Sequence, residues 1–304
     1  MKSIFQTLIF LPLITFSLAA PANPGKAVPS DRLNYKEVWG HDFGKSKVER
    51  TPSNKAFKMI AAKDGNTEFT GINPTNLRLD KDHRLHIIPH GPSETYENLW
   101  TSGKIETVND QFGAEPGKKM IWETRVMVGD ALSKNQQGVQ QDIYLLGTEY
   151  RSHQNSYPRM GELDILKLKD GAESFIPTLH CGEESEGPCN EPTGYQQGEA
   201  EKIPRGEWAR LGLEIDRSMC SGAEDGSCWE LESVNWLLNG RAYRTLTGRE
   251  FGDKAAWARL AHSKKFLTMS VTVGGEKGSS VNKDTLDGDS FGMQVDWVRV
   301  FESK

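Results

Sequence analysis

Short stretches in which apolar and polar residues alternate recur along the chain, and this period of two is typical of β-strands that bury one face. The clearest stretches are 85–88, 120–128, 211–215, 266–273 and 293–300. Clusters of Gly, Asn and Asp separate them and predict turns. Only residues 254–263 have a helical pattern. We therefore expect an all-β fold, a sandwich of two antiparallel sheets.

The net charge of the chain argues against some classes of binding partner. Its 304 residues carry a net charge of −5, and the Lys and Arg residues are scattered rather than clustered. This pattern argues against nucleic acid or an anionic membrane surface as the partner. Eight Trp and seven Tyr residues suggest carbohydrate instead, because the apolar faces of sugar rings stack on aromatic planes.

The N-terminus predicts secretion. An apolar run follows Lys2, and small residues precede a cleavage site after Ala19, so residues 1–19 are expected to be a signal peptide. The run is too short for a membrane-spanning helix, which needs about 20 apolar residues. We expect residues 20–29 to be an extended lead and 30–304 to be a single domain.

Four cysteines in a secreted chain suggest two disulfides. The spacing favours local pairs, Cys181 with Cys189 and Cys220 with Cys228. Metal binding is the alternative, but neither pair has zinc-knuckle spacing and only His180 lies beside one of them. We therefore expect no metal at the cysteines.

One stretch carries the candidate chemistry. Glu162 and Asp164 are two residues apart on a predicted strand, so their carboxylates point to the same face. A retaining glycosidase needs such a face and a second catalytic carboxyl about 5–5.5 Å from the first. If one residue is bulged, the next side chain on this face is Lys167, which is an amine.

Several motifs in one order resemble glycoside hydrolase family 16, specifically the laminarinase-like, fungal-type endo-β-1,3(4)-glucanases. Each motif is weak alone, but their collinear order over nearly the whole mature chain is specific. The matching stretches are Trp39, 42–44, 76–79, 100–105, 161–165, 178–182, 187–194, 236–240, 273–275 and 295–300.

The resemblance implies a concanavalin A-like β-jelly-roll with a sugar-binding cleft across its concave sheet. It implies that Glu162 occupies the nucleophile position and Asp164 that of the assisting aspartate. His180 corresponds to a histidine that contacts the sugar or the catalytic group. Glu68 and Trp100 correspond to residues near sugar contacts. It implies no cofactor other than the structural calcium that members of the family often carry near the termini. The acidic loop 183–186 lacks the ligand spacing of a calcium loop.

The departures from the family pattern gather in the same cleft. Lys167 replaces the acid/base glutamate, and Lys104 replaces an arginine whose planar fork suits paired oxygen ligands. Gln140 and Tyr157 each replace a tryptophan, and Ser270 replaces an asparagine. Positions in the predicted core keep their character. This contrast argues against simple sequence drift in a catalytic enzyme and favours a change in the function of the cleft.

A lysine is a poor proton donor to a leaving group, because an exposed ammonium titrates near about 10.4. Lys167 is also expected to lower the pKa of Glu162. The leading hypothesis is therefore a secreted, monomeric protein that binds β-1,3- or mixed-linkage glucan with little or no hydrolysis. One alternative is an active endo-β-1,3(4)-glucanase in which Glu149, Glu173 or Glu183 supplies the acid. Another is a non-carbohydrate interaction protein on the same fold.

Overall fold

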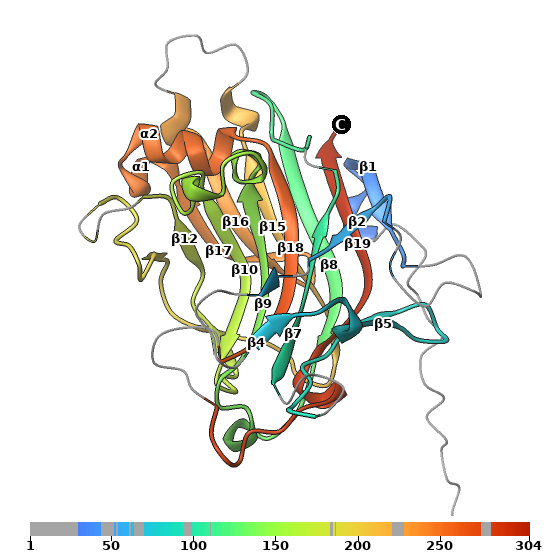
Figure 1. The fold of residues 1–304 in the computed structure, drawn as a ribbon. Helices are drawn as coiled ribbons and strands as arrows, with labels where there is room; N and C mark the ends of the chain where they lie inside the picture. Colours follow the sequence, from blue (N-terminus) through green and yellow to red (C-terminus); the bar gives the residue numbers. More distant parts are fainter. Residues whose placement is uncertain are drawn as a thin grey trace, which may run out of the picture.

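The computed structural model describes the parts of the chain listed at the end of this sentence: 30–43, 52, 54–60, 62–63, 70–93, 99–109, 111–182, 185, 187–220, 228–274 and 281–304. The expected signal peptide and lead, residues 1–29, lie outside these ranges. Within them, the chain folds into two packed β-sheets and a few short helices (Figure 1).

The described strands form an eight-stranded sheet, a nine-stranded sheet and a two-stranded ribbon. The eight-stranded sheet contains β1 (Tyr35–His41), β5 (Leu77–Leu79), β6 (Leu85–Ile87), β8 (Lys119–Val128), β15 (Trp208–Asp216), β16 (Ser233–Leu238), β17 (Arg241–Thr247) and β19 (Met293–Ser303). The nine-stranded sheet contains β2 (Phe57–Met59), β3 (Ala62–Lys63), β4 (Thr70–Ile72), β7 (Trp100–Thr107), β9 (Val139–Gly147), β10 (Glu162–Lys169), β12 (Thr178–His180), β13 (Tyr195–Gln196) and β18 (Lys265–Val273). The ribbon pairs β11 (Ser174–Phe175) with β14 (Glu201–Lys202).

The two sheets face each other across an apolar core, as the alternating pattern predicts. On β9, Ile143 and Leu145 are fully buried in this core. Gln140, Asp142 and Tyr144 alternate with them and line a cavity on the opposite face of the sheet. The predicted antiparallel sandwich is therefore confirmed; among the described strand pairs, only β4 with β7 is parallel.

The order of strands in the nine-stranded sheet sets the position of the cavity. Its path runs β13, β12, β10, β9, β18, β7, β4, β3, so strands distant in sequence become neighbours. β18 pairs with β9 on one side and with β7 on the other. Residues around 104, 142, 167 and 270 are brought onto four adjacent strands in this way.

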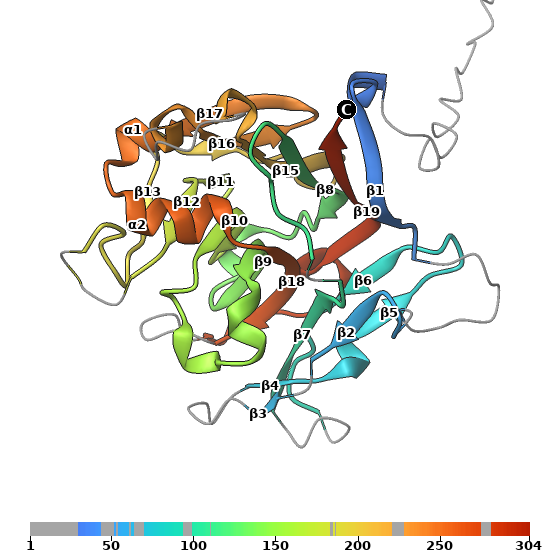
Figure 2. The same cartoon turned by 90° about the horizontal axis from the view of Figure 1, so that it is seen from above.

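Short helices close one edge of the sandwich. The stretch predicted to be helical contains α2 (Lys254–Trp257) followed by a π-helical turn, η9 (Ala258–His262). A second helix, α1 (Gly248–Phe251), precedes it and was not predicted. Figure 2 places α1 and α2 at the edge of the sandwich near β12. Trp257 of α2 is fully buried and anchors this edge to the core.

The remaining described helices are single 3-10 turns. They are η1 (Ser30–Arg32), η2 (Pro74–Asn76), η4 (Ser133–Asn135), η5 (Thr148–Arg151), η6 (Gln154–Ser156), η7 (Ser218–Cys220), η8 (Cys228–Leu231) and η10 (Asp289–Phe291). None of the helices in the described ranges has the length and apolar content to cross a membrane. Both predicted disulfides, Cys181 with Cys189 and Cys220 with Cys228, are present.

Candidate active site

A β-bulge in β10 decides which side chains share a face. Asp164 pairs with Tyr144 of β9, whereas Leu166 pairs with Ile143, so Ile165 is one residue in excess. Ile165 and Leu166 both pack into the core. Lys167 consequently returns to the face that carries Glu162 and Asp164, and all three line one cavity. The strand register thus contains the single bulged residue that the sequence analysis required to place Lys167 on this face.

Gly161 begins this arrangement immediately before Glu162. Its φ of +87° lies in the left-handed region that favours glycine. A Cβ built on it would lie 2.6 Å from the carbonyl oxygen of Arg259, which is closer than real contacts allow. The glycine therefore lets η9 approach the start of β10 and fixes where Glu162 enters the sheet.

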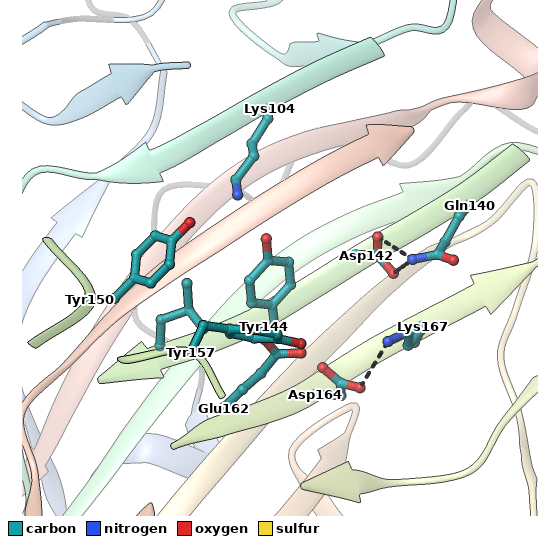
Figure 3. A pocket seen from close by; sticks show the side chains of 10 residues that line it. Lys104, Gln140, Asp142, Tyr144, Tyr150, Tyr157, Glu162, Asp164 and Lys167 are labelled. Carbon is teal, nitrogen blue, oxygen red and sulfur yellow. Dashed lines mark hydrogen bonds and ion pairs between the residues drawn. The ribbon is translucent and has the colours of Figure 1, made fainter. Parts of the chain in front are cut away.

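The cavity has a volume of about 240 Å³ and is open on one side. Its walls are mostly polar, with three tyrosines among them, and Figure 3 shows the side chains converging from neighbouring strands. The lining residues are Lys104, Gln140, Asp142, Tyr144, Leu146, Tyr150, Tyr157, Glu162, Asp164 and Lys167. Carboxylates, amines, an amide and phenol rings in one hollow are suited to binding a polyhydroxylated ligand.

Glu162 and Asp164 form a buried acidic pair at the base of this cavity. Their side chains are only 5% and 1% exposed. Burial raises the pKa of Glu162 well above its ordinary value, and the neighbouring Asp164 raises it further. The pair consequently holds a proton in a range where an isolated glutamate would have lost it.

Lys167 acts on Glu162 in the predicted direction, but the net shift of the Glu162 pKa is upward. Lys167 does act to lower the pKa of Glu162, but burial and Asp164 outweigh it. The Nζ of Lys167 lies 3.9 Å from Oδ2 of Asp164 and is partly exposed to solvent. Water screens such a charge, whereas the carboxylates themselves are almost completely desolvated.

Two tyrosines and Lys104 also line the cavity. The Nζ of Lys104 lies 3.8 Å from a carboxylate oxygen of Glu106 and 5.7 Å from the ring centre of Tyr144. Desolvation and the nearby charge of Glu162 raise the pKa of Tyr144 well above its ordinary value, so its hydroxyl stays protonated at neutral pH. Tyr157 is 45% exposed and offers its ring to a ligand.

Asp142 is a third carboxylate in the cavity, and the sequence analysis did not identify it. It is directly opposite Lys167 in the pairing of β9 with β10. Both of its carboxylate oxygens accept hydrogen bonds from the side-chain amide of Gln140, at 3.0 and 2.9 Å. The hydroxyl of Ser270 donates a longer one, at 3.4 Å. Their spacing puts Gln140 and Asp142 on one face of a strand, but only the register shows that Asp142 lies opposite Lys167.

His180 lies behind the acidic pair and does not line the cavity. Its Nδ1 is 2.8 Å from Oε2 of Glu191, and its Nε2 is 3.9 Å from Oδ2 of Asp164. Glu191 also accepts a hydrogen bond from the backbone N–H of Cys181. The disulfide loop thereby holds the histidine against the acidic pair.

Glu162, Asp164 and His180 are also the group of described residues best placed to hold a metal ion. One ligand atom from each lies within 4.8 Å of the others. Lys167, however, already presents a positive charge 3.9 Å from Oδ2 of Asp164. A cation bound at this carboxylate would be repelled by that ammonium.

The other predicted site residues lie elsewhere. Trp100 is 8% exposed, packs in the hydrophobic core and is not among the residues that line the cavity. Glu149 and Glu173, two of the three suggested substitute acids, do not line it either. Glu68 and Glu183 lie outside the described residues. Asp142 is therefore the extra carboxylate that the fold brings to this cavity.

The chain matches no protein-family model and no curated protein. Its fold is similar to those of several solved glucanases. An endo-1,3-β-glucanase from Streptomyces sioyaensis superposes with a TM-score of 0.77 at 24% sequence identity, covering 91% of this chain and 99% of the glucanase. The catalytic domain of an endo-1,3-β-glucanase (laminarinase) from Thermotoga petrophila gives a TM-score of 0.59 at 18% identity, covering 89% and 98%.

A third solved structure is a mutant of SCLam, a non-specific endo-β-1,3(4)-glucanase from family GH16, with a 1,3-β-D-cellobiosyl-glucose at its active site. Its TM-score is 0.62 at 22% identity, and the match covers 90% of this chain and 96% of SCLam. The chain therefore has the jelly-roll sandwich fold of the laminarinase-like glucanases of glycoside hydrolase family 16.

Proposed function

We propose that the chain is a secreted member of glycoside hydrolase family 16 that binds β-1,3- or mixed-linkage glucan with little or no hydrolysis. The observation that carries the proposal is the position of Lys167. It shares a strand face and a cavity with Glu162 and Asp164, where a retaining enzyme needs its acid/base carboxyl. A family-type site without that carboxyl keeps its shape for sugar but lacks the group that would protonate the leaving oxygen from this position.

The state of Glu162 adds to this argument. Burial and Asp164 raise its pKa, whereas a carboxyl that attacks an anomeric carbon reacts in its charged form. Loss of acid–base help alone lowers rates by roughly 10²–10⁴. Both effects favour recognition over hydrolysis.

The lining of the cavity supports a sugar ligand. Tyr150 and Tyr157 bring aromatic rings to the cavity, and sugar rings stack on such planes. Polar side chains around them suit hydroxyl groups. The glucan oligosaccharide at the active site of SCLam, which has the same fold, makes a β-glucan the first ligand to test.

Secretion is supported by two observations. Residues 1–19 have the pattern of a signal peptide. The chain also forms two disulfides, which persist in oxidising compartments. A secreted glucan-binding protein would meet its ligand in a cell wall.

An active endo-β-1,3(4)-glucanase is the second candidate, and Asp142 is the observation in its favour. Asp142 adds a third carboxylate beside Glu162 and Asp164. Gln140 and Ser270 both donate hydrogen bonds to it, and Lys167 is directly opposite. Asp142 lies on β9 and not at the position on β10 that faces Glu162 and Asp164 along the same strand, where a retaining enzyme would carry its acid, so we rank hydrolysis second.

Binding and hydrolysis are separated by two assays on the wild type and on Glu162→Gln. We expect the wild type to be retained on insoluble β-1,3-glucan and to release no more reducing sugar from laminarin or mixed-linkage glucan than Glu162→Gln does. Turnover that disappears in Glu162→Gln would instead establish an active glucanase. Failure to bind any polysaccharide would favour an interaction protein on the same fold.

A charge exchange tests the role assigned to Lys167. Lys167→Glu is expected to raise reducing-sugar release above the wild-type level, because it restores a second carboxyl on the catalytic face. Lys36→Glu makes the same change on β1 of the eight-stranded sheet and is expected to change nothing. Equal release from the two variants would contradict the role given to Lys167.

A further inference from the structure

A row of polar side chains crosses four strands on the cavity face. Ser270 of β18 is directly opposite Lys104 of β7 on one side and Asp142 of β9 on the other. Asp142 is in turn directly opposite Lys167 of β10. Lys104, Asp142 and Lys167 all line the cavity, so a carboxylate stands between two amines along this row.

Asp142 and Lys167 form the part of this row nearest to the acidic pair. Side chains directly opposite each other on antiparallel strands have Cβ atoms about 4.5–5.5 Å apart. A carboxylate accepts up to about four hydrogen bonds and an ammonium donates three. The pair can therefore keep its protein contacts, such as those of Asp142 with Gln140, and still bind a ligand. It presents a strong acceptor beside a strong donor.

This pairing matches two hydroxyl groups on adjacent carbon atoms of a sugar ring. One hydroxyl donates to the carboxylate of Asp142, and the oxygen of the next accepts from the ammonium of Lys167. A glucosyl residue substituted at O4 keeps its 2- and 3-hydroxyls, which are adjacent. A residue substituted at O3 keeps the 2- and 4-hydroxyls, which are not. The donor and acceptor pair can thus distinguish the two linkages.

We propose that Asp142 and Lys167 form a hydroxyl-binding pair that selects 4-linked glucosyl residues, so that the protein prefers mixed-linkage glucan to pure β-1,3-glucan. The proposal rests on the proposed function, since it assumes that the cavity binds β-glucan. Gln140 is a positioning residue for the pair, because its amide holds both oxygens of Asp142. Lys167 then serves in ligand selection at the position where a glycosidase would carry its acid.

The test compares affinities of the full chain for laminarin and for soluble mixed-linkage β-1,3-1,4-glucan by titration calorimetry. We expect the wild type to bind mixed-linkage glucan roughly tenfold more tightly, as one charge-assisted hydrogen bond allows. Asp142→Asn and Lys167→Met are each expected to reduce this preference to within about twofold. Glu302→Gln, on β19 of the eight-stranded sheet, serves as the control and should retain the preference.

A competition experiment on the wild type does not depend on the folding of any variant. Cellotetraose should displace bound mixed-linkage glucan roughly tenfold more effectively than laminaritetraose. Their non-reducing ends carry the same free hydroxyls, so the difference comes from the other residues, which are substituted at O4 in cellotetraose and at O3 in laminaritetraose. Equal wild-type affinities for both polymers, or a preference that survives both substitutions, would overturn the linkage proposal alone. A wild type that binds neither polymer would overturn the proposed function, and this proposal with it.

Discussion

Glu162 and Asp164 lie two residues apart on one strand face, and burial leaves them little solvent to stabilise two negative charges. The folded protein therefore binds a proton at Glu162 more tightly than the unfolded chain, whose glutamate has the ordinary pKa of 4.5. This proton stabilises the fold fully below that value. The stabilisation is lost as the pH rises through the higher pKa of the folded state.

Removing the ionisable group at Glu162 should consequently change the pH dependence of stability. We expect Glu162→Gln to match the wild type near pH 4 and to become progressively more stable than it as the pH rises to 8. Denaturant unfolding at several pH values measures this. Glu302→Gln removes a carboxyl from β19 of the eight-stranded sheet and serves as the comparison variant. A constant difference between Glu162→Gln and wild type would contradict the raised pKa.

Alternation alone could predict positions in the cleft only for residues that share one strand, whereas Lys104, Gln140 and Tyr157, which also line the cavity, were named from the family resemblance. Glu162, Asp164 and Lys167 share β10, so alternation and one bulge brought them together. Asp142 escaped notice because its significance depends on a neighbouring strand. Trp100 was selected by resemblance, yet its large apolar surface is buried in the core.

At the scale of the element, the backbone at the start of β10 determines where the side chains of this strand lie. Gly161 permits the close approach of the Arg259 carbonyl, and the bulge at Ile165 then sets the face of Lys167. A displacement of the backbone at Gly161 would shift the face of β10 that carries Glu162, Asp164 and Lys167 relative to β9. The start of this strand is therefore expected to be intolerant of any Cβ.

Gly161→Ala and Gly252→Ala separate backbone strain from steric clash. Both glycines have positive φ, +87° and +83°, but a Cβ at Gly252 has open space around it. We expect Gly252→Ala to cost about 1–2 kcal/mol from the left-handed conformation alone. Gly161→Ala should cost at least about 3 kcal/mol and weaken glucan binding. Equal losses of unfolding free energy in the two variants would rule out the clash with Arg259.

The elements themselves were largely readable from the sequence. The five strongest alternating stretches all correspond to strands, and 254–263 is helical. The short helix α1 was missed, although Thr247 and Glu250 form a capping box at its start. Its four residues give too little periodicity to be recognised without that signal.

At the scale of the whole molecule, the two disulfides differ in their position relative to the cavity. Cys181 follows His180 directly, and Glu191, two residues beyond Cys189, bonds to both His180 and the backbone of Cys181. Cys220 and Cys228 lie instead beyond the end of β15, in the connection that leads to β16 of the eight-stranded sheet. The two cross-links close loops of the same length but differ in what they position.

Replacing each cysteine pair by serine should therefore have different consequences for binding. Each double variant is expected to lose about 2–3 kcal/mol of unfolding free energy. Only Cys181→Ser with Cys189→Ser should also weaken glucan binding, because His180 would lose its fixed position beside Asp164. Calorimetric melting and titration measure the two effects. Similar binding losses from both pairs would refute this division of roles.

The two-sheet architecture followed from alternation, but the order of strands did not. Pairing of β18 with both β7 and β9 joins segments more than a hundred residues apart. Hydrophobic periodicity assigns a residue to a face and contains no information on which strand lies beside it. The polar row across the nine-stranded sheet was for this reason invisible before the fold was known.

The pairing of Asp142 with Lys167 has an evolutionary consequence. If an ancestor carried glutamate at position 167, an aspartate arriving at 142 would have faced a like charge on the next strand, which is destabilising. The exchange at 167 is thus expected to have come first. Once Asp142 was in place, reverting position 167 alone would recreate the repulsion. Under the proposed function, the pair would make a catalytic carboxyl at position 167 difficult to gain by a single mutation.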